Sequence, residues 1–507
     1  MVGAVSPCRA TSWHRRWVPA TPSTWWRTAV CSPRVPWWSP PPATRSDPSS
    51  PFPPPWRRRS HQPLRWVPRG SSPRADRTSV AGGGPGTRAG TVCPSARSGG
   101  KHMAYGAERV DSGPVRSWLT DWDWLDDGWG ENAIDIWNDV REQCPIATTE
   151  RYGRAFMPVT MEAVRQIAND TENFSSIWVN VARPDAPRSP APPITSDPPD
   201  HHGHRRLILP TFNPKAVAAI EEELRHFCRK LIADIGDSPT ADAAVQYSQH
   251  IPVHGICILT GLPEEDADLF RDWIYKNFQL APKDNNVRIQ VMTEMGAYIS
   301  EILKERLANP KDDLLTVIAN AEIDGKEVDW NIKVGYVRLQ IVAGIDTTWS
   351  AIGSGLWHFA QHNDQVQRLL AVPNDHELWQ TANEEVLRYY APVTMARKVV
   401  KDVEVSGCPM HAGDQTLVTF PAANHDPAEF ENPGEFVLDR QNNRHVAFGL
   451  GIHRCAGSNL ARLEMIVAFQ EWLRAFPDYR LDPDRKTTWA NGQVRGPRVL
   501  PVLTGRR

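Results

Sequence analysis

Apolar positions along this chain recur mainly at the spacing of α-helices. Between residues 456 and 476, Leu460, Leu463 and Val467 recur at three- and four-residue intervals and form one apolar face. The same periodicity predicts helices at 212–236, 263–280, 289–308, 331–362 and 377–389. Two short stretches, 396–405 and 415–419, are typical of strands. The pattern therefore predicts a mostly α fold with a minor β portion.

The first 102 residues differ from the rest of the chain in composition. They hold 16 lysines and arginines against two acidic residues, and 18 prolines against one leucine and no isoleucine. A segment without apolar periodicity cannot build an ordinary core, so we expect it to be disordered. Residues 103–507 have ordinary composition and are expected to form a single large domain.

Three interpretations of residues 1–102 are open: a basic arm for nucleic acid or anionic lipid, a transit-like leader, and upstream sequence that is not part of the working protein. We favour the third, because the Trp-, Arg- and Pro-rich composition is typical of unselected translation of GC-rich DNA. No nucleic-acid partner is then expected. Arg, Pro and Ser interrupt every apolar stretch of the segment, which argues against a secretory signal and a membrane span.

Eight cysteines occur, without any C-x-x-C pair, and the absence of a secretory signal favours a reducing cytoplasm. Cys455 stands in a glycine-rich loop directly before the predicted helix at 456–476. Free N–H groups and the helix dipole lower the cost of a thiolate at such a position, and glycines allow backbone amides to approach the sulfur. The alternative is an inert buried thiol, which is what most free cysteines are.

The run from Phe448 to Gly457 reads Phe-Gly-Leu-Gly-Ile-His-Arg-Cys-Ala-Gly. It resembles the haem-binding loop F-G-x-G-x-H-x-C-x-G of the cytochrome P-450 family, with every fixed position filled. The resemblance implies the cytochrome P-450 fold of the soluble bacterial type and haem b (iron protoporphyrin IX) as cofactor. Cys455 would be the axial iron ligand, Phe448 would pack beside the sulfur, and His453 would bond a haem propionate.

A second stretch, from Ala343 to Thr348, reads Ala-Gly-Ile-Asp-Thr-Thr and lies within the predicted helix at 331–362. A threonine there can bond the carbonyl one turn earlier and distort the helix, and Gly344 allows a flat cofactor or dioxygen to approach the backbone. An ordinary polar patch is the alternative. The stretch resembles the family's oxygen-activation segment A-G-x-D-T-T, which implies that Asp346 and Thr347 deliver protons to bound dioxygen.

Glu385 and Arg388 stand three residues apart, and so share one face of the predicted helix at 377–389. A solvated salt bridge, worth little, is the alternative. The pair matches the family's E-x-x-R, and Arg440 matches the arginine that completes that network. The resemblance gives these three residues a structural role, in which they hold the loop that leads to Cys455.

The sequence Asp-Pro-Pro-Asp-His ending at His201, followed by Arg205, resembles the family's D-P-P-x-H-x-x-x-R. The resemblance implies that His201 and Arg205 bind one haem propionate, and Arg397 falls where the family places another propionate arginine. His202 and Gly203 depart from the family's common Thr-Arg. A metal site of His201, His202 and His204 is the competing interpretation, but no carboxylate or cysteine completes a zinc set at the usual spacing.

The resemblance places substrate recognition in four mostly apolar stretches, 178–194, 340–347, 393–396 and 489–494. Their candidate polar anchors are Asn180, Arg183, Gln340 and Gln493. Such a lining suits a small to medium hydrophobic molecule. No flavin or iron–sulfur motif is present, so the resemblance implies electrons from a ferredoxin and an NAD(P)H-dependent ferredoxin reductase, which would dock near Cys455 and Arg454.

The sequence thus predicts a cytoplasmic monooxygenase that hydroxylates, O-dealkylates or epoxidises a hydrophobic substrate with dioxygen. A peroxide-dependent haem–thiolate enzyme is one alternative, although such an enzyme has less need of Asp346 and Thr347. A haem-binding sensor or carrier without turnover is another. A nucleic-acid-binding protein rests on residues 1–102 alone.

Overall fold

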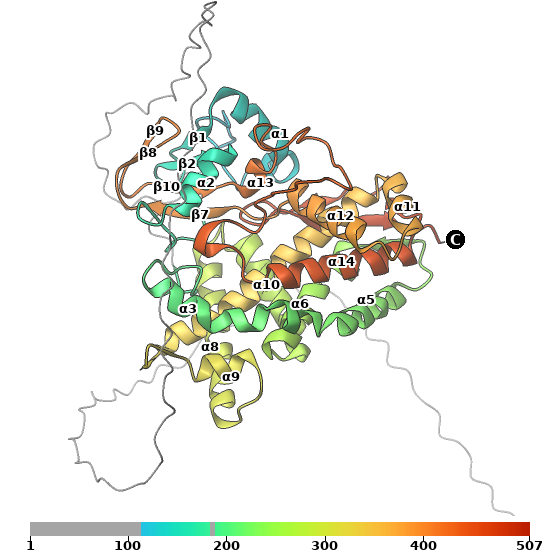
Figure 1. Ribbon diagram of the computed structural model, residues 1–507, viewed down its shortest axis with the longest axis horizontal. Coiled ribbons are helices and arrows are strands. Elements are labelled where there is room, and N and C mark those ends of the chain that lie inside the picture. The colour runs from blue at the N-terminus through green and yellow to red at the C-terminus, as the bar shows by residue number, and fades with distance from the viewer. Residues whose placement is uncertain (1–112, 183–187, 507) are drawn as a thin grey trace, which may run out of the picture. The chain divides into compact units, whose positions relative to one another are not determined.

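The computed structural model describes residues 113–182 and 188–506 of the 507-residue chain. The interpretations of residues 1–102 and of Arg183 lie outside the described residues. Helices dominate the described part (Figure 1). The α-helices are α1 (Asp127–Gln143), α2 (Met161–Asn169), α3 (Asp200–Ile208), α4 (Pro214–Ala218), α5 (Glu221–Ile235), α6 (Ile251–Thr260), α7 (Ala267–Tyr275), α8 (Asn285–Ala308), α9 (Leu314–Ala319), α10 (Trp330–Phe359), α11 (Asn363–Ala371), α12 (His376–Tyr389), α13 (Phe420–Ala423) and α14 (Ser458–Ala475).

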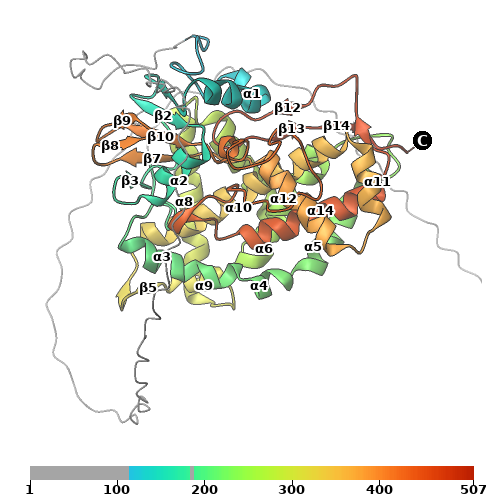
Figure 2. The ribbon, with the colours of Figure 1, turned by 45° about the horizontal axis from the view of Figure 1, so that its top comes forward.

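The strands are short and lie in several small sheets. They are β1 (Ile146–Thr149), β2 (Ala155–Pro158), β3 (Phe174–Ser175), β4 (Thr240–Asp242), β5 (Glu322–Ile323), β6 (Lys326–Glu327), β7 (Met395–Val399), β8 (Val403–Val405), β9 (Cys408–Met410), β10 (Gln415–Val418), β11 (Arg480–Leu481), β12 (Thr488–Trp489), β13 (Pro497–Val499) and β14 (Pro501–Leu503). The largest sheet has the order β1-β2-β10-β7-β3, and β10 pairs parallel to β2 and antiparallel to β7. This sheet lies beside the helical body, together with α1 and α2 (Figure 2).

The structure corrects two of the predicted elements. The helix expected at 212–236 is two helices, because the chain breaks between Ala218 at the end of α4 and Glu221 at the start of α5. The strand expected at 396–405 is also divided: β7 joins the large sheet, whereas β8 pairs with β9 in a separate hairpin. Alternation of apolar residues cannot distinguish one long strand from two that turn into different sheets.

Helix α10 passes through the centre of the helical body (Figures 1 and 2) and is buried on nearly all sides beyond its first turn. It begins at the Asp329 cap, whose side chain accepts a hydrogen bond from the Asn331 N–H. Glycines allow its neighbours to approach closely. A Cβ atom at Gly355 would lie 2.4 Å from the Phe469 ring of α14, and one at Gly344 would lie 3.0 Å from Ile256 of α6. Both helices therefore pack directly against α10.

Glu385 and Arg388 of α12 are fully buried and form an ion pair at 2.8 Å. Arg440, from the chain between α13 and the Cys455 loop, donates from Nε to Glu385 Oε1 at 3.0 Å. The remaining donors of Arg388 reach the carbonyl oxygens of Asn424, Pro433 and Glu435, at 2.8 to 3.0 Å. Sequence reasoning from the residues alone left a solvated salt bridge open, and the burial rules that alternative out.

Replacing Glu385 by Gln tests this network. The change leaves the Arg388 guanidinium buried without its counter-ion, so we expect the free energy of unfolding to fall by about 3 to 5 kcal/mol. Urea unfolding followed by tryptophan fluorescence would measure it. Glu377→Gln, on the exposed face of the same helix, is the matched control and should change stability by at most about 0.5 kcal/mol. Equal stability of the two variants would contradict a structural role for Glu385.

Candidate active site

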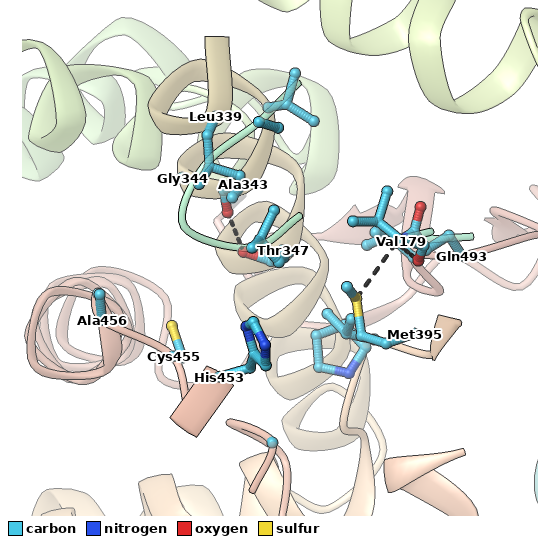
Figure 3. A pocket seen from close by; sticks show the side chains of 18 of the residues that line it. Val179, Leu339, Ala343, Gly344, Thr347, Met395, His453, Cys455, Ala456 and Gln493 are labelled. Carbon is cyan, nitrogen blue, oxygen red and sulfur yellow. Dashed lines mark hydrogen bonds between the residues drawn. The ribbon is translucent and has the colours of Figure 1, made fainter. Parts of the chain in front are cut away.

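A mostly apolar cavity of about 380 Å³ lies between α10 and the loop that precedes α14 (Figure 3). The other walls come from α3, α8, and the chain near Val179, Met395 and Gln493. Of the thirteen residues predicted to bind cofactor, relay protons or brace the loop, those that line it are Arg205, Gly344, Thr347, Arg397, Phe448, His453, Cys455 and Gly457. The structure thus brings residues from distant parts of the chain to one space.

The loop around Cys455 holds the sulfur toward this cavity (Figure 3). Gly449 and Gly451 have φ angles of +72° and +64°, and a Cβ atom at Gly451 would lie 3.0 Å from the Ala168 carbonyl oxygen. Glycine is therefore required at Gly451 on two grounds. The Cys455 N–H donates to the Phe448 carbonyl oxygen at 2.8 Å, and the N–H of Gly457, just before α14, bonds the sulfur.

The Cys455 side chain is accessible from the cavity but enclosed by the protein. Burial raises the pKa of its thiol, while the Gly457 N–H and the charges of Arg205 and Arg454 act in the opposite direction. A cation bound at the sulfur shifts this balance to the thiolate. The donor set is thus one sulfur with N–H support, which suits a soft metal centre that brings its other ligands with it.

Hydrogen-bond donors gather beside Cys455 at one side of the cavity. The rings of His201 and His453 meet edge to face at 4.5 Å, and the Nε2 atoms of both are buried without a hydrogen-bond partner. Arg397 is 4% exposed, and burial lowers its pKa to about 10. Burial, with the charges of Arg397, His201 and Arg205, lowers the pKa of His453 to about 3. Buried donors without acceptors are costly.

These donors lack a pair of carboxylates that would accept their hydrogen bonds. The nearest acid, Asp197, already accepts hydrogen bonds from the Ser175 hydroxyl and the Ser176 N–H. Haem carries two propionates beside an iron that needs an axial ligand, and arginine and imidazole donors suit carboxylates. The side chains present therefore fit haem: Cys455 would hold the iron, and His201, Arg205, Arg397 and His453 would hold the propionates.

The predicted acid–alcohol pair of α10 faces two different environments. The Thr347 hydroxyl lines the cavity and donates to the Ala343 carbonyl oxygen at 2.8 Å (Figure 3), yet α10 remains α-helical through this turn. The neighbouring Asp346 is 1% exposed, and its carboxylate pairs with Arg498 of β13 at 2.9 Å. Burial raises the pKa of Asp346 to about 6, against the opposing charge of Arg498.

Sequence reasoning missed several polar residues at this site. Arg498, far from Asp346 along the chain, showed no local signal. Glu464 of α14 lines the cavity and is fully buried, and burial raises its pKa well above the usual range. The sequence feature that could have identified Glu464 is the presence of an acidic residue on the apolar face of the helix at 456–476. Arg288 and Arg338 also line the cavity, from α8 and α10.

The predicted polar anchors Asn180, Gln340 and Gln493 all line the cavity. Gln493 donates to the Val179 carbonyl oxygen at 2.9 Å. The histidines of the competing metal site point to different partners: His204 bonds the Tyr336 hydroxyl, whereas His201 contacts His453. Over residues 113–182 and 188–506, no group of three or more His, Cys, Asp or Glu side chains could hold a metal ion, and none of the helices is long and apolar enough to span a membrane.

Known proteins resemble this chain in sequence and in fold. The sequence model described as Cytochrome P450 matches residues 374–489. A putative cytochrome P450 126 of Mycobacterium tuberculosis is 31% identical over 399 residues, which cover 74% of this chain and 94% of the relative. The chain belongs to the cytochrome P450 family. The predicted family and fold class are thereby confirmed.

Other relatives bear on the activity of this P450. A steroid C26-monooxygenase of Rhodococcus jostii is 32% identical over 59% of this chain and 64% of its own length. The structure of the polyketide synthase cytochrome P450 PksS of Bacillus subtilis superposes with a TM-score of 0.67, at 28% identity, over 76% of this chain and 99% of PksS. This P450 is a monooxygenase of the bacterial type.

Arg397→Met tests the fit of the donors to haem. The loss of a charged hydrogen bond of about 1.5 to 3 kcal/mol should weaken haem retention roughly ten- to hundredfold. The measurement is the transfer of haem to an excess of a haem-scavenging apoprotein. Lys398→Met, the next residue of β7, removes the same charge from a side chain that packs on Trp178 and should retain haem normally. Equal transfer rates would contradict the assignment of Arg397.

Proposed function

We propose that this P450 uses haem b to activate dioxygen and to hydroxylate, O-dealkylate or epoxidise a hydrophobic molecule. One observation carries the proposal: the Cys455 sulfur and the Thr347 hydroxyl face the same apolar cavity, beside buried donors without acceptors (Figure 3). Haem bound there would supply an iron centre at which dioxygen is reduced, with a thiolate that favours O–O cleavage. The apolar walls would exclude water and select a hydrophobic substrate.

Thr347 and Asp346 divide the handling of protons between them. The Thr347 hydroxyl donates its own proton to Ala343, so its oxygen lone pairs are free to hold a water molecule in the cavity. Asp346 lies behind the cavity wall, and its pKa of about 6 allows it to take up and release a proton near neutral pH. Its carboxylate must leave Arg498 before it can exchange a proton with the Thr347 side.

A ferredoxin, reduced by an NAD(P)H-dependent ferredoxin reductase, is proposed as the electron donor. Arg454 is exposed directly beside Cys455, where a positive charge would favour an acidic partner. Turnover with ferredoxin, reductase and dioxygen, but not with peroxide alone, would support this proposal over the peroxide-dependent alternative. The cytoplasmic location stays a prediction from the sequence, which cell fractionation would test.

The carbon monoxide complex of the reduced protein tests thiolate ligation. We expect absorption at the long wavelength that gives the family its name, and its loss in Cys455→His, because an imidazole donates less electron density to the iron. Cys257→Ala, which alters a buried thiol of α6 away from the cavity, should keep the long-wavelength band. Persistence of this band in Cys455→His would refute the assignment of Cys455.

Arg498→Gln tests the control of Asp346. The guanidinium lowers the pKa of Asp346, so its removal should raise that pKa above its value of about 6. The pH midpoint of product formation per NAD(P)H consumed should therefore move upward. Arg485→Gln, at an exposed position of the C-terminal region, should leave the midpoint in place. An unchanged midpoint in Arg498→Gln would show that Asp346 does not limit proton delivery.

A further inference from the structure

Two arginines, Arg288 and Arg338, line the cavity from α8 and α10. Arg338 stands nine residues before Thr347 on α10, which places it about 13 Å farther along the helix axis. Arg288 lines the same cavity from the first turns of α8, a helix that packs against α10. Neither residue belongs to the set that fits the haem propionates.

The guanidinium groups of these arginines are only partly satisfied by the protein. Arg338 donates to the Pro190 carbonyl oxygen at 3.2 Å, and Arg288 to the Ala281 carbonyl oxygen at 3.3 Å. The Nε atoms of both are buried without an acceptor. Within the described residues, no carboxylate lies within ion-pair distance of either group, and burial lowers the pKa of both.

Both guanidinium groups lie near the segment that begins at Arg188. The Arg338 Nη2 atom lies 3.6 Å from the position a Cβ atom would take at Gly296, so the side chain reaches toward α8. The Pro190 carbonyl oxygen of that segment contacts Arg338, and the charge of Arg288 lowers the pKa of Arg188. Arg188 also stacks on Trp178, with 4.2 Å between guanidinium and ring.

The charges of the cavity do not balance. Its described lining contains one acid, Glu464, whose pKa is raised by burial, against five arginines: Arg188, Arg205, Arg288, Arg338 and Arg397. The two propionates of haem would neutralise Arg205 and Arg397. No counter-ion for Arg288 or Arg338 lies among the described residues, and a charge removed from water is costly unless it is paired. An anion supplied by the substrate would complete the site.

We propose that this P450 binds a hydrophobic monocarboxylate, whose carboxylate pairs with Arg338 while Arg288 adds positive charge to the same cavity and the carbon to be oxidised lies near Thr347. The planar donor fork of arginine matches a carboxylate. The spacing along α10 sets the two ends of the substrate on the order of 10 to 15 Å apart. The inference rests on the proposed function, because it names the substrate of the same cavity.

Isothermal titration of the haem-loaded protein with octanoate, dodecanoate and hexadecanoate tests the proposal. The methyl esters and the alkyltrimethylammonium ions of matching length serve as neutral and cationic counterparts. We expect at least one carboxylate to bind roughly tenfold or more tightly than its ester, since a hydrogen bond to a charged group contributes about 1.5 to 3 kcal/mol. The cation should bind weakest. Esters that bind as tightly as the acids throughout would overturn the proposal.

Variants of the two arginines test whether Arg288 and Arg338 cause the preference for carboxylates over esters. Arg288→Gln and Arg338→Gln should each weaken carboxylate binding roughly tenfold and leave ester binding unchanged. Arg338→Glu should reverse the preference, so that the cation binds better than the acid. Lys304→Gln removes the same charge from the exposed part of α8 and should change neither affinity. Unchanged carboxylate affinity in both glutamine variants would overturn the assignment.

The carbon monoxide spectrum separates this inference from the proposed function. If the variants keep the long-wavelength band but show no change in ligand preference, the carboxylate site is wrong and haem–thiolate ligation stands. If the wild-type protein lacks that band but titration still shows binding of the carboxylate, the arginine site stands and the proposed chemistry fails.

Discussion

The carboxylate of Glu385 connects the helical body to the chain that carries the cysteine. It is fully buried and accepts hydrogen bonds from Arg388, Arg440, the Val437 N–H and Asn443. A buried charge is tolerable only when it is paired and every lone pair is used, so this segment has one low-energy path past α12. The loop around Cys455 follows that segment directly. Its geometry therefore depends on an ion pair that never contacts a ligand.

The cost of burying a polar group without a partner also applies to the cavity, but there the protein leaves such groups unpaired. Around Glu385 the protein satisfies its own buried charges, whereas around the cavity it leaves donors without acceptors, at His201 and His453 and again at Arg288 and Arg338. Such unpaired groups destabilise the ligand-free protein, and this loss of free energy is recovered when a ligand supplies the acceptors. In our proposal these two groups of donors would bind two separate sets of anionic oxygens, one on the cofactor and one on the substrate.

Helix α10 forms the wall of the cavity that carries Arg338 and Thr347, and Asp346 lies on the same helix. Because neighbouring residues of a helix project in different directions, Thr347 reaches the cavity while Asp346 reaches Arg498 behind it. Asp346 is therefore kept out of the cavity lining, yet it stays within one residue of the Thr347 hydroxyl. Arg338, on the same helix, sets the far end of the cavity. In our proposal, the spacing between Arg338 and Thr347 on α10 thus sets the distance between the substrate carboxylate and the carbon that is oxidised.

Local patterns were enough to predict the long helices, the turn at Cys455 and the family, because helix periodicity and glycine-dependent loops depend on neighbours only a few residues away. They also identified Thr347 and the pair of Glu385 and Arg388 as candidate functional and structural residues. Three features needed the folded chain: the contact of Asp346 with Arg498, the presence of both Arg288 and Arg338 in the lining of one cavity, and the division of 396–405 between two sheets. Each depends on which distant groups share a space without water, and burial decides the charge state of each group.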